Sequence, residues 1–519
     1  MAIYKANITL IASLAKESLS SVSPLSLPSR QRIKPSILVG IQVKCIPAIA
    51  TVQDTLLKQL PFSSLELDAN LLKNLDSLGY TAMTPIQAES LPAILAGKDV
   101  IAQGQTGSGK TAAFGLGLLN KLDVKRFRIQ TLVLCPTREL ADQVAVEIRK
   151  LARTIHNIKV LTLCGGTPLG PQIGSLEHGA HIIVGTPGRI DDHLQKGTLK
   201  LDNLHTLVLD EADRMLDMGF QETIDTIIDA APKKRQTLLF SATFPSEIAS
   251  IARRIMVNPV SVEAASSHDN DSIEQHFYEV GGNSERTDAI HRLLMEFRPQ
   301  SSVVFCNTKL ETQQLADKLH YIGFDVLSIH GDLDQRERDQ ALLRFANGSV
   351  SVLVATDVAA RGLDIESLDA VFNYHIANDL EVHTHRIGRT GRAGEKGIAC
   401  SLFSEKEHFK LERLQAEMKQ NIRDEALPSR NLTDKPPFQA KMVTLQIDGG
   451  KKQKIRPGDI LGALTGENGI AGDQVGKIHR FDNHSYVAIN KDSRQAAVNK
   501  LNAGKLKGRN FRVRVIDSY

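Results

Sequence analysis

The fold is decided by residues 99–114, which have the sequence DVIAQGQTGSGKTAAF. An apolar run typical of a buried strand leads into a Gly-rich turn, and the turn leads into a segment typical of a helix. Glycines in this context let backbone N–H groups surround phosphate oxygens, while a lysine and a threonine supply a positive charge and a Mg²⁺ ligand. The pattern predicts a phosphate-binding loop made of Gly104, Gln105, Thr106, Gly107, Ser108, Gly109, Lys110 and Thr111.

Other apolar, β-branched runs follow this loop and alternate with helical patterns. The first series consists of 131–135, 160–164, 182–185, 206–209 and 237–240, and the second of 302–306, 326–329, 350–355, 370–374 and 398–403. Alternation of this kind predicts two parallel α/β sheets, which bind ligands at the carboxyl ends of their strands. The last eighty residues have the order strand, helix, strand, strand, helix, strand, which predicts a small α+β domain.

We predict five segments from these patterns and from the length, at roughly 150 residues per domain. They are an N-terminal extension at 1–51, α/β domains at 52–264 and 272–420, a linker at 421–441 and the α+β domain at 442–519. The first fifty residues are Ser-rich and contain six Lys or Arg against one acid. A transit peptide and a disordered or misassigned start both fit this composition, and we favour the second.

The composition also excludes several classes of protein. Hydrophobic residues make up 42% and charged residues 24%, and no run of about 18 apolar residues could span a bilayer, so no integral membrane protein is expected. The five cysteines form no CxxC pair, and four lie in strand-like runs. We therefore expect buried reduced thiols rather than disulfides or metal ligands.

Positive charge is concentrated near the C-terminus. Residues 440–519 contain 15 Lys and Arg against 7 Asp and Glu, whereas the rest of the chain contains 48 against 52. A local excess of this size favours a polyanion as partner, because each phosphate contact releases condensed counterions.

Two further motifs complete the nucleotide site. Asp210 and Glu211 end an apolar strand, so we expect Asp210 to ligate Mg²⁺ together with Thr111, and Glu211 to orient or deprotonate the attacking water. Residues 385–392, HRIGRTGR, carry a density of guanidinium groups that no structural role requires. Arg389 and Arg392 are candidate arginine fingers for the γ phosphate, and Lys110 completes the expected catalytic set.

From Phe62 to about Phe403 these motifs resemble the DEAD-box RNA helicases. The resemblance implies two RecA-like domains in tandem, ATP and Mg²⁺ as cofactors, RNA-dependent ATP hydrolysis and local strand separation. It implies adenine contacts for Phe62 and Gln87 and a nucleotide contact for Asp364. The implied coupling residues are Ser241, Thr243 and His385. The implied RNA contacts of the core are Pro136, Thr137, Arg138, Gly166, Thr186, Pro187, Gly188, Arg189, Gln335, Arg338, Thr356 and Gly362.

The tail resembles the RNA-binding domain of a bacterial branch of this family. That resemblance implies an RRM-like fold, a hairpin of 23S rRNA as target, large ribosomal subunit precursors as partners, a monomer and a cytoplasmic location. The tail departs from the usual stacking signature, because Thr444 replaces an aromatic while His484 and Tyr486 occupy the third-strand positions. We therefore expect basic residues to form the RNA surface, namely Lys451, Lys452, Lys454, Arg456, Lys507, Arg509, Arg512 and Arg514.

Two other interpretations stay open. The chain could be an ATP-controlled clamp or assembly scaffold that grips RNA without unwinding it, although its intact catalytic residues favour an enzyme. A phosphate-loop kinase or a DNA helicase fits less well, because the Gln87 region and the tail both match an RNA helicase.

Overall fold

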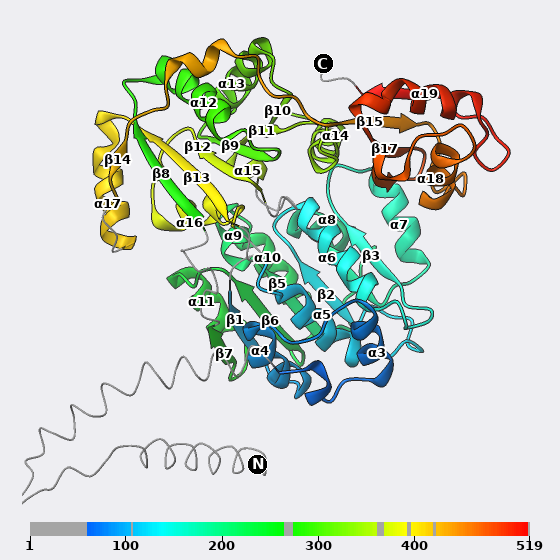
Figure 1. Cartoon of the computed structure of the whole chain (residues 1–519). Helices are drawn as coiled ribbons and strands as arrows, with labels where there is room; N and C mark the ends of the chain where they lie inside the picture. The colour runs from blue at the N-terminus through cyan, green and yellow to red at the C-terminus, as the bar shows by residue number, and fades with distance from the viewer. Residues whose placement is uncertain are drawn as a thin grey trace, which may run out of the picture. The chain divides into compact units, whose positions relative to one another are not determined.

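The computed structural model describes residues 60–104, 107–263, 273–360, 368–391, 396–418 and 422–516 (Figure 1). The first sheet is parallel and has the order β3-β4-β2-β5-β6-β1-β7. Its strands are β1 (Val100–Gln103), β2 (Thr131–Leu134), β3 (Val160–Leu163), β4 (Ile182–Gly185), β5 (Thr206–Asp210), β6 (Gln236–Ser241) and β7 (Val260–Glu263). The strands β2, β4, β5 and β6 are buried along their whole length, as expected for a parallel sheet that is covered by helices.

Each helix of this domain follows a strand of the sheet or precedes the first one. They are α3 (Ala69–Ser77), α4 (Pro85–Leu95), α5 (Lys110–Asn120), α6 (Arg138–Leu151), α7 (Leu169–Glu177), α8 (Pro187–Gln195), α9 (Ala212–Asp217), α10 (Gln221–Asp229) and α11 (Ser246–Ile255). Asp68 caps α3 and Thr137 caps α6 with side-chain oxygens that accept backbone N–H groups. Capping of this kind begins a helix directly after a strand-end loop.

The second sheet is also parallel and has the order β10-β11-β9-β12-β13-β8-β14. Its strands are β8 (Ile273–Glu279), β9 (Ser302–Cys306), β10 (Val326–Ile329), β11 (Val352–Thr356), β12 (Ala370–Asn373), β13 (Gly397–Phe403) and β14 (Asp424–Glu425). Its helices are α12 (Asn283–Phe297), α13 (Lys309–Ile322), α14 (Gln335–Ala346), α15 (Asp357–Ala360), α16 (Leu380–Ile387) and α17 (His408–Met418). The sequence did not predict β7, β8 or β14.

The segment that was expected to be a linker packs on the second domain instead. Its strand β14 pairs with β8, and Leu427, Leu432 and Phe438 pack against the second core. Prolines interrupt the periodicity of this segment, so the sequence pattern does not reveal the apolar residues that pack against the second domain. Residues 1–59 and 264–272 lie outside the described residues.

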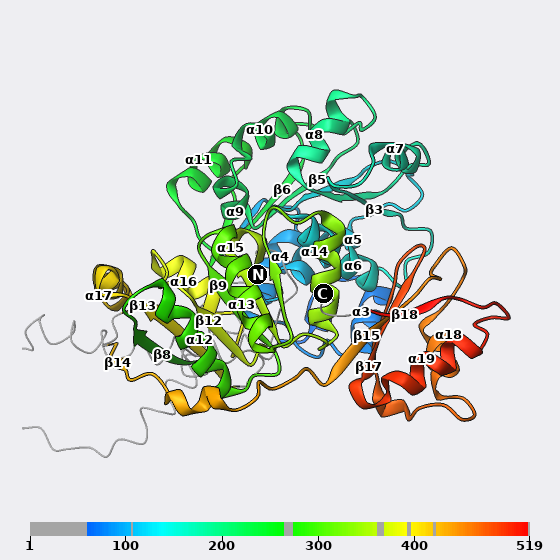
Figure 2. The same ribbon diagram turned by 90° about the horizontal axis from the view of Figure 1, so that it is seen from above.

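The C-terminal domain is a four-stranded antiparallel sheet of order β16-β17-β15-β18, with two helices (Figure 2). Its elements are β15 (Met442–Ile447), α18 (Pro457–Thr465), β16 (Val475–Arg480), β17 (Ser485–Asn490), α19 (Arg494–Ala503) and β18 (Val513–Ile516). Ile460 and Leu501 of the helices pack with Leu445 and Val487 of one sheet face. The predicted fold class, two RecA-like sheets and a small α+β domain, is confirmed.

Four cysteines, Cys135, Cys164, Cys306 and Cys400, are buried and free, as expected, and burial raises the pKa of each thiol. Among the described residues no helix has the length and apolar character needed to cross a membrane.

Candidate ATP and RNA site

The phosphate loop joins β1 to α5 at the carboxyl edge of the first sheet. Gly107 and Gly109 have positive φ angles of 84° and 91°, which favour glycine. A Cβ on Gly109 would lie 2.4 Å from Gln87 Nε2, so the close approach also needs glycine. Lys110 is buried, and its Nζ donates to Gly104 O at 2.6 Å. A carbonyl of the loop therefore binds the ammonium group of Lys110. Gln105 and Thr106 lie outside the described residues.

Gln87, one of the two predicted adenine residues, contacts this loop. Gln87 Oε1 accepts from Thr84 N at 2.9 Å, and Gln87 Nε2 donates to Gly109 O at 3.0 Å. Thr84 Oγ1 donates to Ser108 O at 2.7 Å. The structure thus ties Gln87 to the phosphate loop. Phe62 is buried at 4% exposure and packs edge-to-face on Tyr80, with ring centroids 6.1 Å apart.

Asp210 ends β5 beside the loop and fits a metal ligand. It is 2% exposed, and its Oδ1 has no hydrogen-bond partner among the described residues. Burial raises the pKa of Asp210 to about 7, against the charge of Lys110, which lowers it. A buried carboxylate oxygen with no protein partner, near a loop that ends in Thr111, suits a hard cation such as Mg²⁺.

Glu211 is held in an unusual backbone conformation. Its φ of 51° is in the left-handed region, which non-glycine residues seldom adopt. Its Oε2 lies 2.7 Å from Arg214 Nη1, and both side chains are almost fully buried. A buried pair of this kind fixes the carboxylate in one position.

Asp213, a residue that the sequence motifs did not identify, contacts the predicted coupling residues. Its Oδ2 accepts from Ala242 N at 3.0 Å, from Thr243 N at 2.8 Å and from Thr243 Oγ1 at 3.0 Å. Asp213 N in turn donates to Ser241 Oγ at 3.3 Å. Asp213 follows Glu211 with only Ala212 between them, and this spacing is the sequence signal that could have identified Asp213.

Arg389 and His385 of the second domain come together with Arg214 of the first domain. A cavity of about 20 Å³ is lined by Arg214, Phe305, Asp357, Val382, His385, Arg386 and Arg389. Burial, followed by the charge of Arg214, lowers the pKa of His385 to about 4. One predicted finger, one predicted coupling residue and the partner of Glu211 therefore share one cavity, while Arg392 lies outside the described residues.

Arg386 corrects the expectation that the arginines of residues 385–392 have no structural role. Its Nε and Nη2 donate to the two oxygens of Asp357, each at 2.7 Å, and its Nη1 donates to His375 O at 2.9 Å. The guanidinium also lies over Phe305, 5.4 Å from the ring centroid. This arginine ties three strand ends of the second sheet together.

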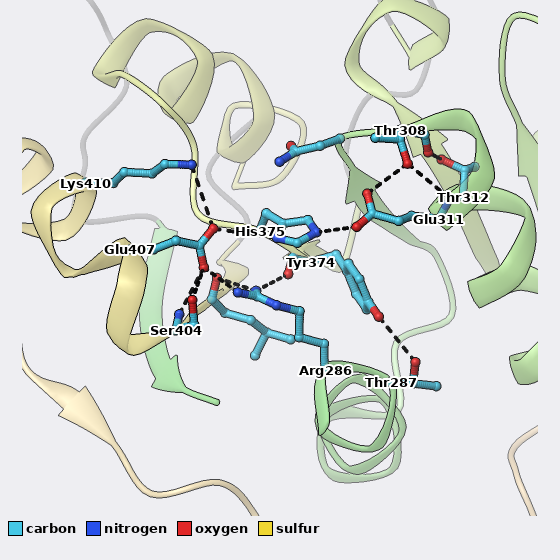
Figure 3. Close-up of polar contacts among 12 residues, drawn as sticks. Arg286, Thr287, Thr308, Glu311, Thr312, Tyr374, His375, Ser404, Glu407 and Lys410 are labelled. Carbon is cyan, nitrogen blue, oxygen red and sulfur yellow. Dashed lines mark hydrogen bonds and ion pairs between the residues drawn. The ribbon is translucent and has the colours of Figure 1, made fainter. Parts of the chain in front are cut away.

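A polar network supports the same edge of the second sheet (Figure 3). His375 Nε2 lies 2.9 Å from Glu311 Oε1, and His375 Nδ1 lies 3.6 Å from Glu407 Oε1. Arg286 donates to Tyr374 O, Leu402 O and Glu407. Burial alone would raise the pKa of Glu407, but the bond from His375 and the charge of Arg286 hold it below its usual range.

Four of the predicted RNA contacts meet between the first sheet and α14. Arg138 Nη1 donates to Gln335 Oε1 at 2.7 Å, and Arg338 Nη2 lies 3.3 Å from Glu139 Oε1. Gly166 has a positive φ of 74°, which favours glycine, and it lies against the end of the Arg138 side chain. Strand-end loops of the first sheet thus meet a helix of the second.

The other predicted core contacts lie at strand ends. Thr137 caps α6, and Thr186 and Pro187 begin α8 with Gly188 next. Arg189 Nη1 donates to Thr167 O at 3.1 Å, and Thr356 ends β11. Pro136 is buried before α6. Gly362 and Asp364 lie outside the described residues.

The predicted basic surface of the tail is solvent-exposed throughout. Lys451, Lys452, Lys454, Arg456, Lys507, Arg509, Arg512 and Arg514 are all exposed. Lys507 Nζ lies 3.3 Å from Asp459 Oδ2, and Arg514 Nη2 lies 3.9 Å from Asp448 Oδ1. Both pairs are weak at this exposure, so the surface keeps an excess of positive charge.

Comparison with known proteins agrees with this arrangement. Three family models match, namely the DEAD/DEAH box helicase at residues 84–251, the helicase conserved C-terminal domain at 285–394 and the DbpA RNA binding domain at 444–515. The chain therefore belongs to the DEAD-box family of ATP-dependent RNA helicases, as the sequence predicted.

The similarity to one relative spans nearly the whole of that relative. The chain is 55% identical to the ATP-dependent RNA helicase DbpA of Escherichia coli K12 over 456 residues, which cover 88% of this chain and 99% of that protein. It is thus of the DbpA type, with a C-terminal RNA-binding domain. It is also 45% identical to the DEAD-box helicase CshA of Bacillus cereus, over 70% of this chain and 69% of CshA.

A solved structure shows the same core. Dbp5 of Saccharomyces cerevisiae, described as bound to RNA and ADP BeF3, matches with a TM-score of 0.64 and 32% identity. The match covers 73% of this chain and 100% of that chain.

Proposed function

We propose that the two sheets hydrolyse ATP jointly while they hold RNA, and that neither sheet can do so alone. The observation that carries the proposal is the cavity in which His385 and Arg389 meet Arg214, the partner of Glu211. The cavity supports a site to which both domains contribute, and in this proposal hydrolysis depends on their meeting.

Each group has a role that its surroundings support. Lys110 supplies a positive charge to the β and γ phosphates, which the turns at Gly107 and Gly109 surround with N–H groups. Glu211 orients or deprotonates the attacking water, since its backbone and Arg214 fix its carboxylate. Arg389 neutralises charge on the γ phosphate, and we assign the same role to Arg392. A finger contributes roughly a thousandfold or more to the rate, which is about 4 kcal/mol.

Mg²⁺ is the cofactor that fits Asp210 and Thr111. Asp210 and Thr111 would hold the Mg²⁺, which would supply positive charge against the negative charge that develops on the phosphates. The unpartnered Oδ1 of Asp210 supports this assignment. Gln87, Phe62 and Asp364 complete the nucleotide site in our proposal, with Gln87 moving from Gly109 to the adenine edge.

The core contacts hold RNA by its backbone. Arg138, Gln335 and Arg338 already lie together, so RNA phosphates would replace their present contacts with one another and with Glu139. Backbone contacts carry no base information, so the core is indifferent to sequence. Asp213 links Ser241 and Thr243 to the acids, which supports a coupling role for these residues and His385.

The tail supplies the selectivity in this proposal. Its match to the DbpA RNA binding domain and its exposed basic residues support a hairpin of 23S rRNA as target, and large ribosomal subunit precursors as partners. We further propose a cytoplasmic monomer that acts off the membrane. The predicted segments at 52–264, 272–420 and 442–519 contain the three matched family models.

ATP turnover tests this function and separates it from a clamp that grips RNA without unwinding. Turnover is measured with and without a 23S rRNA transcript, for the wild type and for Glu211→Gln. We expect RNA to stimulate the wild type and Glu211→Gln to be inactive while still binding RNA. Equal slow rates in all four cases would reject catalysis and leave the clamp.

A further inference from the structure

The sheet face on which RRM-like domains usually stack bases is covered in this chain. Thr444 is fully buried, Gln446 is 6% exposed and Ala488 is 1% exposed. Thr444 Oγ1 accepts from Asn347 Nδ2 at 3.1 Å and lies 2.7 Å from Ser349 Oγ, and both partners belong to the segment after α14. The second domain therefore occupies the centre of this face, and a base cannot stack there.

One end of the same sheet stays open, at the turn between β16 and β17. Phe481 is 39% exposed, and its ring lies nearly parallel to that of His484, with centroids 5.5 Å apart and an interplanar angle of 27°. Both rings meet Tyr486 edge-on, at 5.6 Å and 5.2 Å. Tyr486 is only 8% exposed and so anchors the two outer rings.

Backbone hydrogen bonds join this turn to a lysine-containing loop after β15. Lys451 N donates to Phe481 O at 2.8 Å, and Lys452 N donates to Asp482 O at 2.9 Å. A Cβ on Gly450 would lie 2.2 Å from Phe481 O and 2.8 Å from His484 N, so only glycine permits this approach. The turn that carries the aromatic rings and the loop that carries the two lysines are thus joined by their backbones.

The charges of this unit suit a nucleotide. Within residues 422–516 the ammonium groups of Lys451 and Lys452 are exposed and form no ion pair, whereas Lys507 is paired with Asp459. Asp482 is the acid on the turn itself, and its carboxylate can accept hydrogen bonds from the amino groups of a base. Aromatic faces beside cationic groups are the usual arrangement for binding unpaired nucleotides.

We propose that Phe481 and His484 form a stacking site for one unpaired base of an RNA loop, and that Lys451 and Lys452 bind the flanking phosphates. This site rests on the proposed function and names the part of the tail that reads a single-stranded loop. It replaces the covered sheet face as the base-binding surface.

The chain contains no tryptophan, which makes a direct test possible in the full-length protein. Phe481→Trp places a single tryptophan in the site and keeps an aromatic face. We expect its fluorescence to be quenched when a 23S rRNA transcript is added. Tyr321→Trp is the matched control, because Tyr321 is 92% exposed on α13 of the second domain, and its fluorescence should not change.

Affinity provides the second readout, with generic single-stranded RNA as competitor. Phe481→Ala should weaken binding of the 23S rRNA transcript about 5-fold to 150-fold, the range for one stacked base, while Phe481→Trp binds like the wild type. Replacing both Lys451 and Lys452 by Ala should lower the salt dependence of binding by about two counterions. Thermal unfolding of each variant checks that the tail is folded.

The outcomes distinguish this site from the proposed function. A wild type that shows no preference for the 23S rRNA transcript overturns both. A wild type that prefers the transcript, with equal affinity of Phe481→Ala and Phe481→Trp and no quenching in Phe481→Trp, overturns the stacking site alone. Quenching by a protein extract but not by RNA would assign the rings to a protein partner and reject the proposal.

Discussion

The two parallel sheets have the same topology, but the cation that follows the first strand of each sheet has a different partner. The strand order β3-β4-β2-β5-β6-β1-β7 becomes β10-β11-β9-β12-β13-β8-β14 when seven is added to each number. Lys110 and Thr111 stand seven and eight residues after the end of β1, and Arg286 and Thr287 stand seven and eight residues after the end of β8. Both sheets therefore place a cation at the same topological position.

The partner of the cation makes the difference. Lys110 Nζ donates to the carbonyl of Gly104 in its own loop, and no carboxylate forms an ion pair with it among the described residues. Arg286 is 2% exposed and is ion-paired with Glu407 across the carboxyl ends of β12 and β13 (Figure 3). In our proposal the first sheet keeps its cation for a phosphate, whereas the second supplies an anion of its own. Under this proposal one architecture serves catalysis in one copy and stability in the other.

The largest effect is expected from breaking the internal pair. Arg286→Ala leaves Glu407, whose side chain is 14% exposed, without its guanidinium partner, so we expect the free energy of unfolding of the second domain to fall by about 3 to 5 kcal/mol. Urea unfolding measures this change in the free energy of unfolding. Arg413→Ala removes an exposed pair with Glu417 and should change the stability by at most about 1 kcal/mol. Arg286→Met with Glu407→Leu should recover most of the loss, and equal losses in the single and double variants would contradict the comparison.

Lys110→Ala should have the opposite signature. We expect ATP turnover to fall about 100-fold to 1000-fold, the loss typical of one charge-stabilising group, with the urea midpoint unchanged. Steady-state turnover and urea unfolding of the same preparation measure both. Lys196→Ala, an exposed lysine at the end of α8, should match the wild type in both. A large loss of stability in Lys110→Ala would show that the two cations have the same task.

The sequence predicted what depends on local patterns. The phosphate loop, the acids after β5 and the arginines after α16 are each written in a few consecutive residues. The ion pair of Arg286 could not be predicted from local patterns, because its partner Glu407 lies 121 residues away. The structural role of Arg386 could not be predicted either, because its partners lie at the ends of three different strands. The departure at Thr444 was visible in the sequence, but its reason, contact with Asn347 and Ser349, is tertiary.

Acid should weaken the second sheet through His383. This imidazole is 1% exposed, and burial, followed by the charge of Arg386, lowers its pKa to about 4. The unfolded chain binds a proton near pH 6.5 whereas the native state does not, so stability falls as the pH drops from 7 toward 4. We expect a loss of about 2 kcal/mol between pH 7 and pH 5, measured by hydrogen exchange of α16. His383→Gln should lack this part of the loss, and the same pH dependence in both would contradict the assignment.

The smallest effect concerns the contact between the tail and the second domain. Thr444→Val keeps the shape of the side chain but removes its hydroxyl, so Asn347 and Ser349 lose their partner. We expect about 1 to 2 kcal/mol of destabilisation, measured as faster proteolysis between residues 435 and 441. Thr465→Val, on the exposed end of α18, is the control. If both variants are cleaved at the wild-type rate, these bonds do not hold the tail.

The proposed function depends on residues of the second domain acting on a nucleotide that the first domain holds. ATP turnover at saturating ATP and RNA, measured for Arg389→Ala against Arg430→Ala, tests this most directly, because Arg430 is an exposed arginine of the second domain. We predict that Arg389→Ala lowers turnover about 1000-fold, with ATP still bound by the first domain, and that Arg430→Ala turns over like the wild type. Turnover of Arg389→Ala within about threefold of the wild type would contradict it, since that factor is far below the effect of an arginine finger.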